Sequence, residues 1–295
     1  MLSRRGAIAV AGTMAAALAL LAGCSATGLL NGISRIAPNG DAAVRAAAGV
    51  LFGPDPRLKL DVWVPKARHG EKLPKVVFFY GGGWVAGERG EYGFAGRAFA
   101  AQGFVAIIPD YRLVPEVRFP SFVEDGALAV KWARDHASEF GGDPDRITLA
   151  GHSAGSYIGA MLALDRHYLA DAGVDPKVVR AAALLSGPYD FYPFTERRGR
   201  DALGQWPRPR ETQPIGFVRR DAPPLLLITG TADTTVRPRN SEHLAAALAR
   251  AGATVELKRY AGRSHIDTAK ALSPIFRGSN PALADSVAFL KAHVR

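Results

Sequence analysis

The segment Gly151-His152-Ser153-Ala154-Gly155 fits the pattern G-x-S-x-G, which holds a serine on a sharp turn between a strand and a helix. A β-prone apolar run directly precedes it and a helical pattern follows, as this turn requires. The flanking glycines relieve the crowding that such a turn imposes on the backbone. We therefore predict that Ser153 is a nucleophile. A structural serine in a Gly-rich turn is the alternative.

A serine hydroxyl needs a histidine to accept its proton and an acid to orient that histidine. Where the G-x-S-x-G turn is catalytic, the acid and then the histidine follow the serine in the chain. Asp233 comes just after an apolar run, and Asp190 is the reserve acid. Beyond Asp233, His265 lies in a turn after a strand-like run, whereas His243 and His293 lie in helical patterns. We predict Asp233 as the acid and His265 as the base; a capping or surface role is the alternative for His265.

Backbone N–H groups must approach the substrate closely to stabilise the oxyanion of an acyl transfer, and glycines permit this approach. The run Tyr80-Gly81-Gly82-Gly83-Trp84 follows an apolar segment and supplies such glycines. The remaining donor is expected to be the N–H of Ala154, the residue after the nucleophile. A phosphate-binding loop is the alternative, but the run lacks the Lys-Ser/Thr pair of a P-loop and the spacing of a dinucleotide fingerprint.

These residues have to be positioned by the elements around them. Short apolar runs, several of them continuous, predict strands that are covered on both faces. The predicted strands are residues 59–64, 75–80, 104–108, 146–150, 181–185, 225–229 and 254–259. The longer helical patterns between them are residues 93–102, 120–140, 154–165, 239–251 and 281–294. This alternation predicts an α/β domain with a mostly parallel central sheet and helices on both faces.

We find no internal repeat or linker in the body, so residues 57–295 are expected to form a single catalytic domain. Residues 24–56 are rich in small residues, Gly and Pro, and have little periodicity, which predicts an N-terminal tether. Residues 189–221 interrupt the pattern. This segment is expected to be a short lid-like insertion over the mouth of the site, and an ordinary surface loop is the alternative.

Residues 1–23 have the pattern of an export signal. Arg4 and Arg5 precede a charge-free stretch, residues 7–22, which is shorter than the ~20 residues of a membrane-spanning helix. Leu21-Ala22-Gly23-Cys24 resembles the lipobox of bacterial lipoproteins, in which the cysteine is lipidated. We expect export to a bacterial cell envelope and a lipid anchor at Cys24. An ordinary cleaved signal and an uncleaved anchor remain alternatives, and the export route stays open.

The composition excludes several other classes. Of 295 residues, 48% are hydrophobic and 22% are charged, which is typical of a folded domain. The net charge of +10 is spread along the chain without a run of like charges, so we expect no nucleic-acid partner. Cys24 is the single cysteine, which excludes an intrachain disulfide and a cysteine zinc site.

With these motifs in order, the chain resembles the α/β-hydrolase superfamily, and more narrowly the esterase/lipase branch related to hormone-sensitive lipase and bacterial carboxylesterases. The segment Asp110-Tyr111-Arg112-Leu113-Val114-Pro115-Glu116 is similar to a further motif of that branch, as are Phe119-Pro120 and the Gly-Asp-Pro of residues 142–144. The resemblance implies the α/β-hydrolase fold, with Gly82, Gly83 and Ala154 as oxyanion donors. Two positions depart from the branch, which usually has His in place of Tyr80 and often has Asp in place of His152.

The resemblance and the motifs predict a serine carboxylesterase that works without a cofactor or metal. Because the chain shows no large N-terminal cap, short acyl or aryl esters are favoured over long-chain lipids. An arylformamidase or amidase of the kynurenine formamidase-like type is one alternative. A non-catalytic binding lipoprotein is the other. The oligomeric state and the physiological ester are left open.

Overall fold

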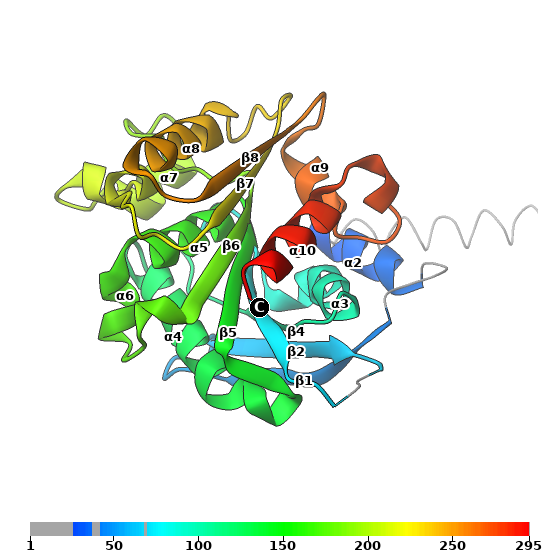
Figure 1. Ribbon diagram of the computed structural model, residues 1–295. Helices are drawn as coiled ribbons and strands as arrows, with labels where there is room; N and C mark the ends of the chain where they lie inside the picture. The colour runs from blue at the N-terminus through cyan, green and yellow to red at the C-terminus, as the bar shows by residue number, and fades with distance from the viewer. Residues whose placement is uncertain (1–25, 37–41, 68–69, 295) are drawn as a thin grey trace, which may run out of the picture.

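The computed structural model of the protein describes residues 26–36, 42–67 and 70–294, and within them an eight-stranded sheet runs through the molecule (Figure 1). Its strand order is β1-β2-β4-β3-β5-β6-β7-β8. β1 and β2 pair antiparallel, as do β2 and β4, and the remaining neighbours are parallel. The strands are β1 (Ala43–Leu51), β2 (Lys59–Pro65), β3 (Leu73–Phe79), β4 (Val105–Pro109), β5 (Gly142–His152), β6 (Val179–Leu185), β7 (Leu225–Gly230) and β8 (Val255–Tyr260).

The central strands form where the sequence has continuous apolar runs. Every residue of β4 and of β7 is buried, and β3 is buried from Lys75 to Phe79. Strands that are covered on both faces need such runs, because neither row of side chains meets water. All the strands predicted from the sequence are present, and their bounds differ from the expected ones by a few residues.

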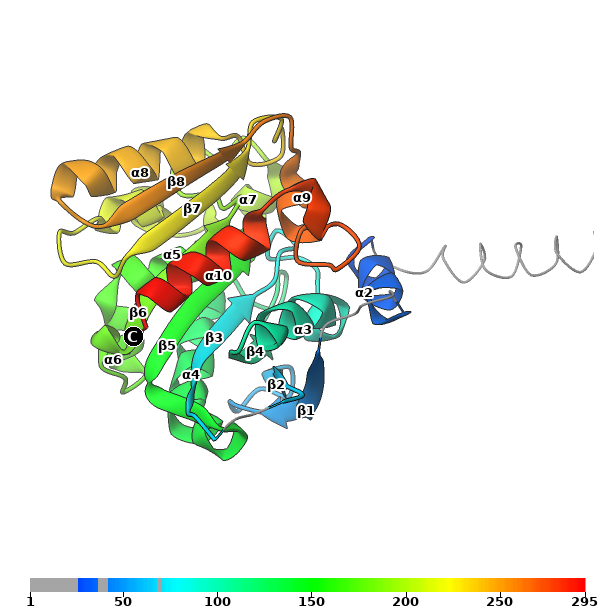
Figure 2. The ribbon, with the colours of Figure 1, turned by 45° about the vertical axis from the view of Figure 1, so that its right-hand side comes forward.

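Helices cover both faces of the sheet, as the alternating pattern predicts (Figures 1 and 2). On one face, α3 packs on β2 and β4 and contacts α10, which packs on β6 and β7. On the other face, α4 and α5 contact each other and pack on β3 and β5. The helices are α2 (Ala26–Ile36), α3 (Gly93–Ala101), α4 (Ser121–His136), α5 (Ala154–Leu164), α6 (Arg166–Asp171), α7 (Arg197–Leu203), α8 (Arg239–Ala251), α9 (His265–Lys270) and α10 (Ala282–Ala292).

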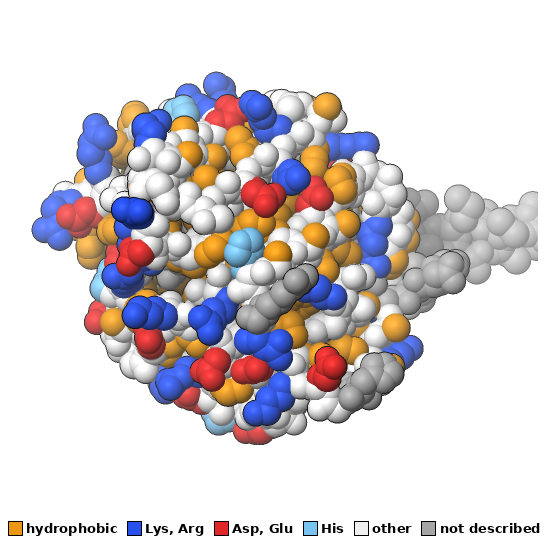
Figure 3. Space-filling view, in the orientation of Figure 1, with side chains coloured by type: hydrophobic (Ala, Val, Ile, Leu, Met, Phe, Trp, Pro, Cys, Tyr) orange, Lys and Arg blue, Asp and Glu red, His pale blue; other side chains and the backbone are white. Residues whose placement is uncertain are grey.

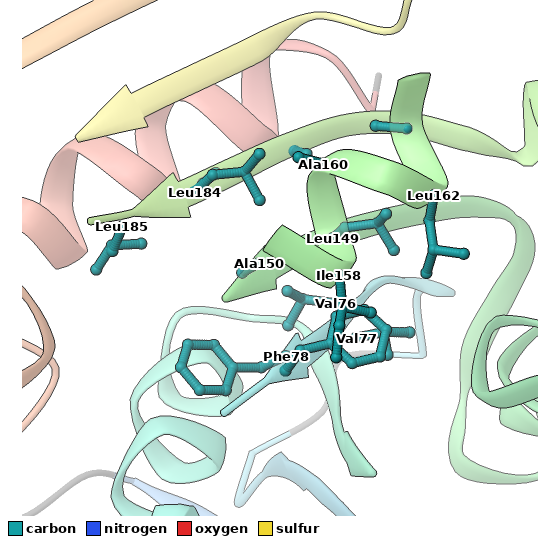
Figure 4. Packing of buried hydrophobic residues seen from close by; sticks show 14 of the residues in the cluster. Val76, Val77, Phe78, Leu149, Ala150, Ile158, Ala160, Leu162, Leu184 and Leu185 are labelled. Carbon is teal, nitrogen blue, oxygen red and sulfur yellow. The ribbon is translucent and has the colours of Figure 1, made fainter. Parts of the chain in front are cut away.

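α5 lies at the centre of the core. All of its residues are buried, and its side chains pack against those of β3, β5 and β6 (Figure 4). Gly159 allows a close approach, because a Cβ atom there would lie 2.9 Å from Cδ2 of Leu184 on β6. This packing fixes the start of α5, and therefore the turn that holds Ser153, relative to the sheet.

The prediction that residues 24–56 are an irregular tether was wrong for most of the described part of that segment. Residues 26–36 form α2, which packs on α3, and residues 43–51 form β1, which pairs with β2. β1 has mostly exposed or half-buried side chains and is rich in alanine, so it lacks the apolar run that marks an inner strand. The predicted signal peptide, residues 1–23, and Cys24 lie outside the described residues.

The insertion at residues 189–221 contains α7 and two short 3-10 helices, Pro209–Thr212 and Pro214–Phe217. Among the helices of the described ranges, none has the length and hydrophobicity needed to cross a bilayer. On the face shown in Figure 3, Lys and Arg side chains lie interspersed with Asp and Glu. That distribution matches the scattered charges of the sequence.

Candidate active site

Ser153 occupies the turn between β5 and α5, with backbone angles φ 56° and ψ −122°. This left-handed conformation is strained for a residue with a side chain, and it is held because β5 and α5 are both packed in the core. Gly155 makes the turn possible, since a Cβ atom there would lie 2.0 Å from the carbonyl oxygen of Phe79. The Ser153 N–H donates to the carbonyl of Leu185 at 2.9 Å. The structure therefore shows the strand–turn–helix context that the motif predicts.

Asp233 and His265 meet beyond the carboxyl ends of β7 and β8. His265 Nδ1 lies 2.8 Å from Asp233 Oδ2, and the Asp233 side chain is fully buried. The other carboxylate oxygen, Oδ1, accepts the N–H groups of Thr235 at 3.0 Å and Val236 at 2.8 Å. An ionised Asp233 thus holds His265 with the proton on Nδ1, which leaves Nε2 as a proton acceptor.

His265 is the first residue of α9, whereas the sequence predicted a turn. Ser264 caps this short helix, and its backbone N–H and hydroxyl both donate to Asp267 Oδ2, at 2.9 and 2.7 Å. The cap and the bond to Asp233 fix both the backbone and the ring of His265.

The structure pairs the reserve acid, Asp190, with a different histidine. Asp190 Oδ2 lies 2.6 Å from His243 Nδ1 on α8, and the side chains of both residues are partly exposed. His265 is bonded to Asp233 instead. Among the described residues, no group of three His, Cys, Asp or Glu side chains is arranged to hold a metal ion.

His152, at the position where the esterase/lipase branch often has Asp, contacts the backbone of His265 at the start of α9. Its Nε2 lies 3.1 Å from the carbonyl oxygen of His265, so Nε2 carries the proton and donates it. Burial, together with the neighbouring His265, lowers the pKa of His152 to about 3, so the ring is neutral at ordinary pH. Sequence reasoning did not find this contact, because no local pattern connects residues 152 and 265.

Gly82 and Gly83 follow β3 in a loop with φ angles of +144° and +62°. A Cβ atom on Gly82 would lie 1.9 Å from the carbonyl oxygen of Ala86, so only glycine fits there. Ala154, the first residue of α5, is buried beside Ser153, and its N–H belongs to the free first turn of the helix. All three predicted oxyanion donors line the same cleft as Ser153 and His265.

Tyr80 replaces the usual His at the start of this loop and anchors it. Its hydroxyl donates to Asp110 Oδ1 at 3.1 Å, and its carbonyl accepts the hydroxyl of Tyr111 at 2.9 Å. The Tyr80 and Tyr111 rings stack with centroids 4.6 Å apart. Arg57 donates to the carbonyls of Tyr111 and Gly87, both at 2.8 Å, and so ties the far end of the loop. The loop is therefore held by a tyrosine–aspartate contact.

The cleft above these residues has a volume of about 1020 Å³. The insertion forms one of its walls, so the prediction of a segment over the mouth of the site is favoured over an ordinary surface loop. Trp84, Phe191 and Phe194 give this side an aromatic surface, in which the rings of Trp84 and Phe191 are stacked 6.2 Å apart. Further lining residues are Thr195, Glu196, Arg197, Arg198, Thr234, Thr235, Arg237 and Arg239.

Comparisons with known proteins agree with this geometry. The BD-FAE family model matches residues 60–248. The chain is 36% identical to esterase LipC of Mycobacterium tuberculosis, over 63% of the chain and 51% of LipC. It is 28% identical to the isoprenylcysteine alpha-carbonyl methylesterase ICME of Arabidopsis thaliana, over 90% of the chain and 66% of ICME. The chain thus spans about half to two thirds of the length of these curated relatives.

A solved structure shows the same fold along nearly the whole chain. The hyperthermophilic esterase of the archaeon Pyrobaculum calidifontis superimposes with a TM-score of 0.72 at 25% identity, and the match covers 90% of each chain. The fold is that of the α/β-hydrolase superfamily, as the sequence motifs predict.

Proposed function

We propose that this chain, which belongs to the BD-FAE family, hydrolyses carboxylic esters through an acyl-enzyme on Ser153. One observation supports this most strongly. A single cleft contains Ser153, the Asp233-bound His265 and the backbone of Gly82 and Gly83. A nucleophile, its base and its oxyanion donors are the groups that ester hydrolysis requires. The esterases among the similar proteins support the same reaction.

The reaction takes two steps. The Ser153 oxygen attacks the ester carbonyl carbon while Nε2 of His265 takes the hydroxyl proton, and the buried Asp233 stabilises the resulting imidazolium. The N–H groups of Gly82, Gly83 and Ala154 receive the oxyanion. Collapse of this intermediate breaks the bond to the alcohol, which leaves with the proton from His265. Water then attacks the acyl-enzyme in the same way, and this releases the acid and restores Ser153.

Short acyl or aryl esters are the substrates that we propose for this cleft. The aromatic surface of Trp84, Phe191 and Phe194 offers stacking to a flat aryl group. The insertion that carries two of these residues is short, with α7 and two 3-10 helices, and this supports small substrates.

The test is a panel of p-nitrophenyl esters from acetate to palmitate, together with N-formylkynurenine. Wild-type protein is compared with Ser153→Ala and with Ser138→Ala, whose serine is exposed and does not line the cleft. We expect cleavage that is highest for short acyl chains and falls by about a thousandfold or more in Ser153→Ala only. Turnover of the formamide alone would favour the amidase, and no labelling of Ser153 by an organophosphate would favour a binding protein.

We also propose that the mature protein is exported and lipid-anchored at Cys24, on the bacterial membrane facing the periplasm or the outside. The support lies in the sequence, where Leu21-Ala22-Gly23-Cys24 follows a basic start and an apolar stretch. A diacylglyceryl mass increase on Cys24 is expected in wild type and absent in Cys24→Ser, and globomycin should block the removal of residues 1–23 that follows lipidation. An unmodified, freely released wild-type protein would contradict the proposal.

A further inference from the structure

Arginine side chains gather on two walls of the cleft. Arg197 and Arg198 lie on α7 of the insertion, whereas Arg237 precedes α8 and Arg239 begins it. All four line the cleft and are exposed to solvent. The proposed steps of ester hydrolysis do not involve these four side chains, so we ask what else they could bind.

Arg198 lies directly over the oxyanion loop. A Cβ atom on Gly83 would be 2.7 Å from Cδ of Arg198 and 3.4 Å from its Nη1. The guanidinium group of Arg198 therefore lies beside the loop at which the carbonyl of an ester substrate would bind.

Arg237, on the other wall, follows directly after the turn that Asp233 stabilises. The two N–H groups that Asp233 accepts come from Thr235 and Val236, which directly precede Arg237. The Arg237 carbonyl in turn accepts the N–H of Asn240 at 3.0 Å, at the start of α8. This wall is thus built from the same rigid turn that orients His265.

Within the described ranges, three of these cations have no acidic partner. Arg197 pairs with Asp201 at 3.3 Å. In the part of the chain that the structure describes, no carboxylate oxygen lies within 4.0 Å of a guanidinium nitrogen of Arg198, Arg237 or Arg239.

The carboxylates on or near these walls are mostly paired, since Asp201 pairs with Arg197 and Glu242 pairs with Arg259. Glu196 lines the cleft, Asp233 is buried beneath His265, and Asp190 is paired with His243. Among the residues that the structure describes, Glu196 is therefore the one carboxylate that lines the cleft, against three guanidinium groups without an ion pair.

We propose that Arg198, Arg237 and Arg239 form a subsite for a carboxylate on the ester substrate. This inference rests on the proposed function. Arginine suits the role because its planar group donates two parallel hydrogen bonds to a carboxylate. The attraction strengthens when the bound substrate displaces water from the aromatic side of the cleft. The substrate class is then a half-ester or an ester of a carboxyl-bearing aryl group.

The experiment compares esters of matched shape, one charged and one neutral, after the spontaneous hydrolysis of each ester is subtracted. On the acyl side, p-nitrophenyl hemisuccinate is compared with p-nitrophenyl isocaproate, in which an isopropyl group replaces the carboxylate. On the alcohol side, m-carboxyphenyl acetate is compared with m-isopropylphenyl acetate. The readout is the ratio of kcat/KM for the charged ester to kcat/KM for the neutral one, which cancels any general damage to the enzyme.

We expect wild type to prefer the charged member of at least one pair by about tenfold or more, and this preference to shrink as salt rises. Arg198→Gln should lower the ratio by about tenfold, with Arg198→Lys in between, and the triple glutamine variant of the subsite should abolish the preference. Arg250→Gln is the control, because Arg250 lies at the far end of α8 and does not line the cleft.

Other outcomes separate the two proposals. Hydrolysis of the neutral esters with ratios near one overturns the carboxylate subsite and leaves the esterase intact. A preference that survives in the triple variant also overturns the subsite. Failure to hydrolyse any of the four esters overturns the proposed function, and the subsite with it.

Discussion

The imidazole of His152 is buried directly beside that of His265, with ring centroids 4.8 Å apart. Its Nε2–H donates to the His265 carbonyl, which leaves Nδ1 unprotonated and buried near Gly81. A second positive charge here would lie next to the imidazolium that the proposed acyl transfer forms on His265. Burial lowers the pKa of His152 to about 3 and so keeps this ring neutral through the reaction.

That lowered pKa makes the fold sensitive to acid. An unfolded chain binds a proton at His152 below pH 6.5, whereas the folded protein does so only near pH 3, so stability falls as the pH drops through this window. The slope is about 1.4 kcal/mol per pH unit. We expect His152→Asn, whose amide keeps a donor, to show a shallower loss between pH 6 and 4 in urea unfolding.

The control is His136→Asn, since His136 is exposed, pairs with Glu139, stacks on the ring of Trp132 and does not line the cleft. Its acid profile should match wild type. An unchanged slope in His152→Asn would mean that His152 is protonated in the folded protein.

Single residues differ in how far the sequence identifies them. Ser153, Asp233 and His265 follow the strands β5, β7 and β8, so the topology alone brings them to one edge of the sheet. Arg198 belongs to an exposed, charged helix with no motif, and its position over Gly83 depends on how the insertion folds back. Contacts of that kind are tertiary, and no local pattern predicts them.

At the scale of elements, the loop after β3 depends on its anchor. The buried Tyr80 hydroxyl is a fixed donor, because burial raises its pKa, and Asp110 is held in turn by the backbone N–H and the guanidinium of Arg89. Arg89 also bonds Asp61 of β2 at 3.0 Å. The position of the proposed oxyanion donors is thus set by contacts with residues of the neighbouring strands.

We predict that Tyr80→Phe lowers kcat by about tenfold with a smaller change in KM, because the loop loses its anchor and misplaces the oxyanion donors. The free energy of unfolding should fall by about 1 kcal/mol. The values of kcat and KM are measured with a short p-nitrophenyl ester, and the free energy of unfolding is measured by urea unfolding.

Tyr260→Phe is the matched control, since the Tyr260 hydroxyl donates to Asp285 of α10 at 2.7 Å, away from the loop. It should lose similar stability and keep its kcat. Equal losses of kcat in both variants would show that the Tyr80 contact matters only for stability.

Most of the elements with a strong hydrophobic signal were predicted, and several without one were missed. α8 has the bounds expected from its periodicity, and the inner strands follow their apolar runs. β1 was missed because its outer position buries little, and α7 because its sequence begins with charged residues. Such segments are ordered by their neighbours rather than by their own pattern.

Across the whole molecule, the sheet positions the site, and one of its central strands carries a buried lysine that lowers stability. Lys75 lies on β3, five residues before Tyr80, and is fully buried. Its ammonium group has three protons to donate, yet Ala133 supplies the one acceptor that the structure gives it, a carbonyl at 2.9 Å. Burial therefore lowers the pKa of Lys75 to about 8, so the strand that leads to the oxyanion loop carries a poorly solvated charge at neutral pH.

We predict that Lys75→Met stabilises the protein at pH 7. The pKa of Lys75 is about 8 in the folded protein and 10.5 in the unfolded chain, so the unfolded chain binds more protons between these pH values. Wild-type stability therefore rises with pH across that window, and the full cost of burying the charge applies below pH 8. Removing the charge should gain about 2–3 kcal/mol at pH 7 in urea unfolding, and this gain should shrink by pH 10. Lys72→Met, at an exposed position nearby, should change little. A Lys75→Met variant that is less stable than wild type at pH 7 would show that the Ala133 contact outweighs the cost of burying the charge.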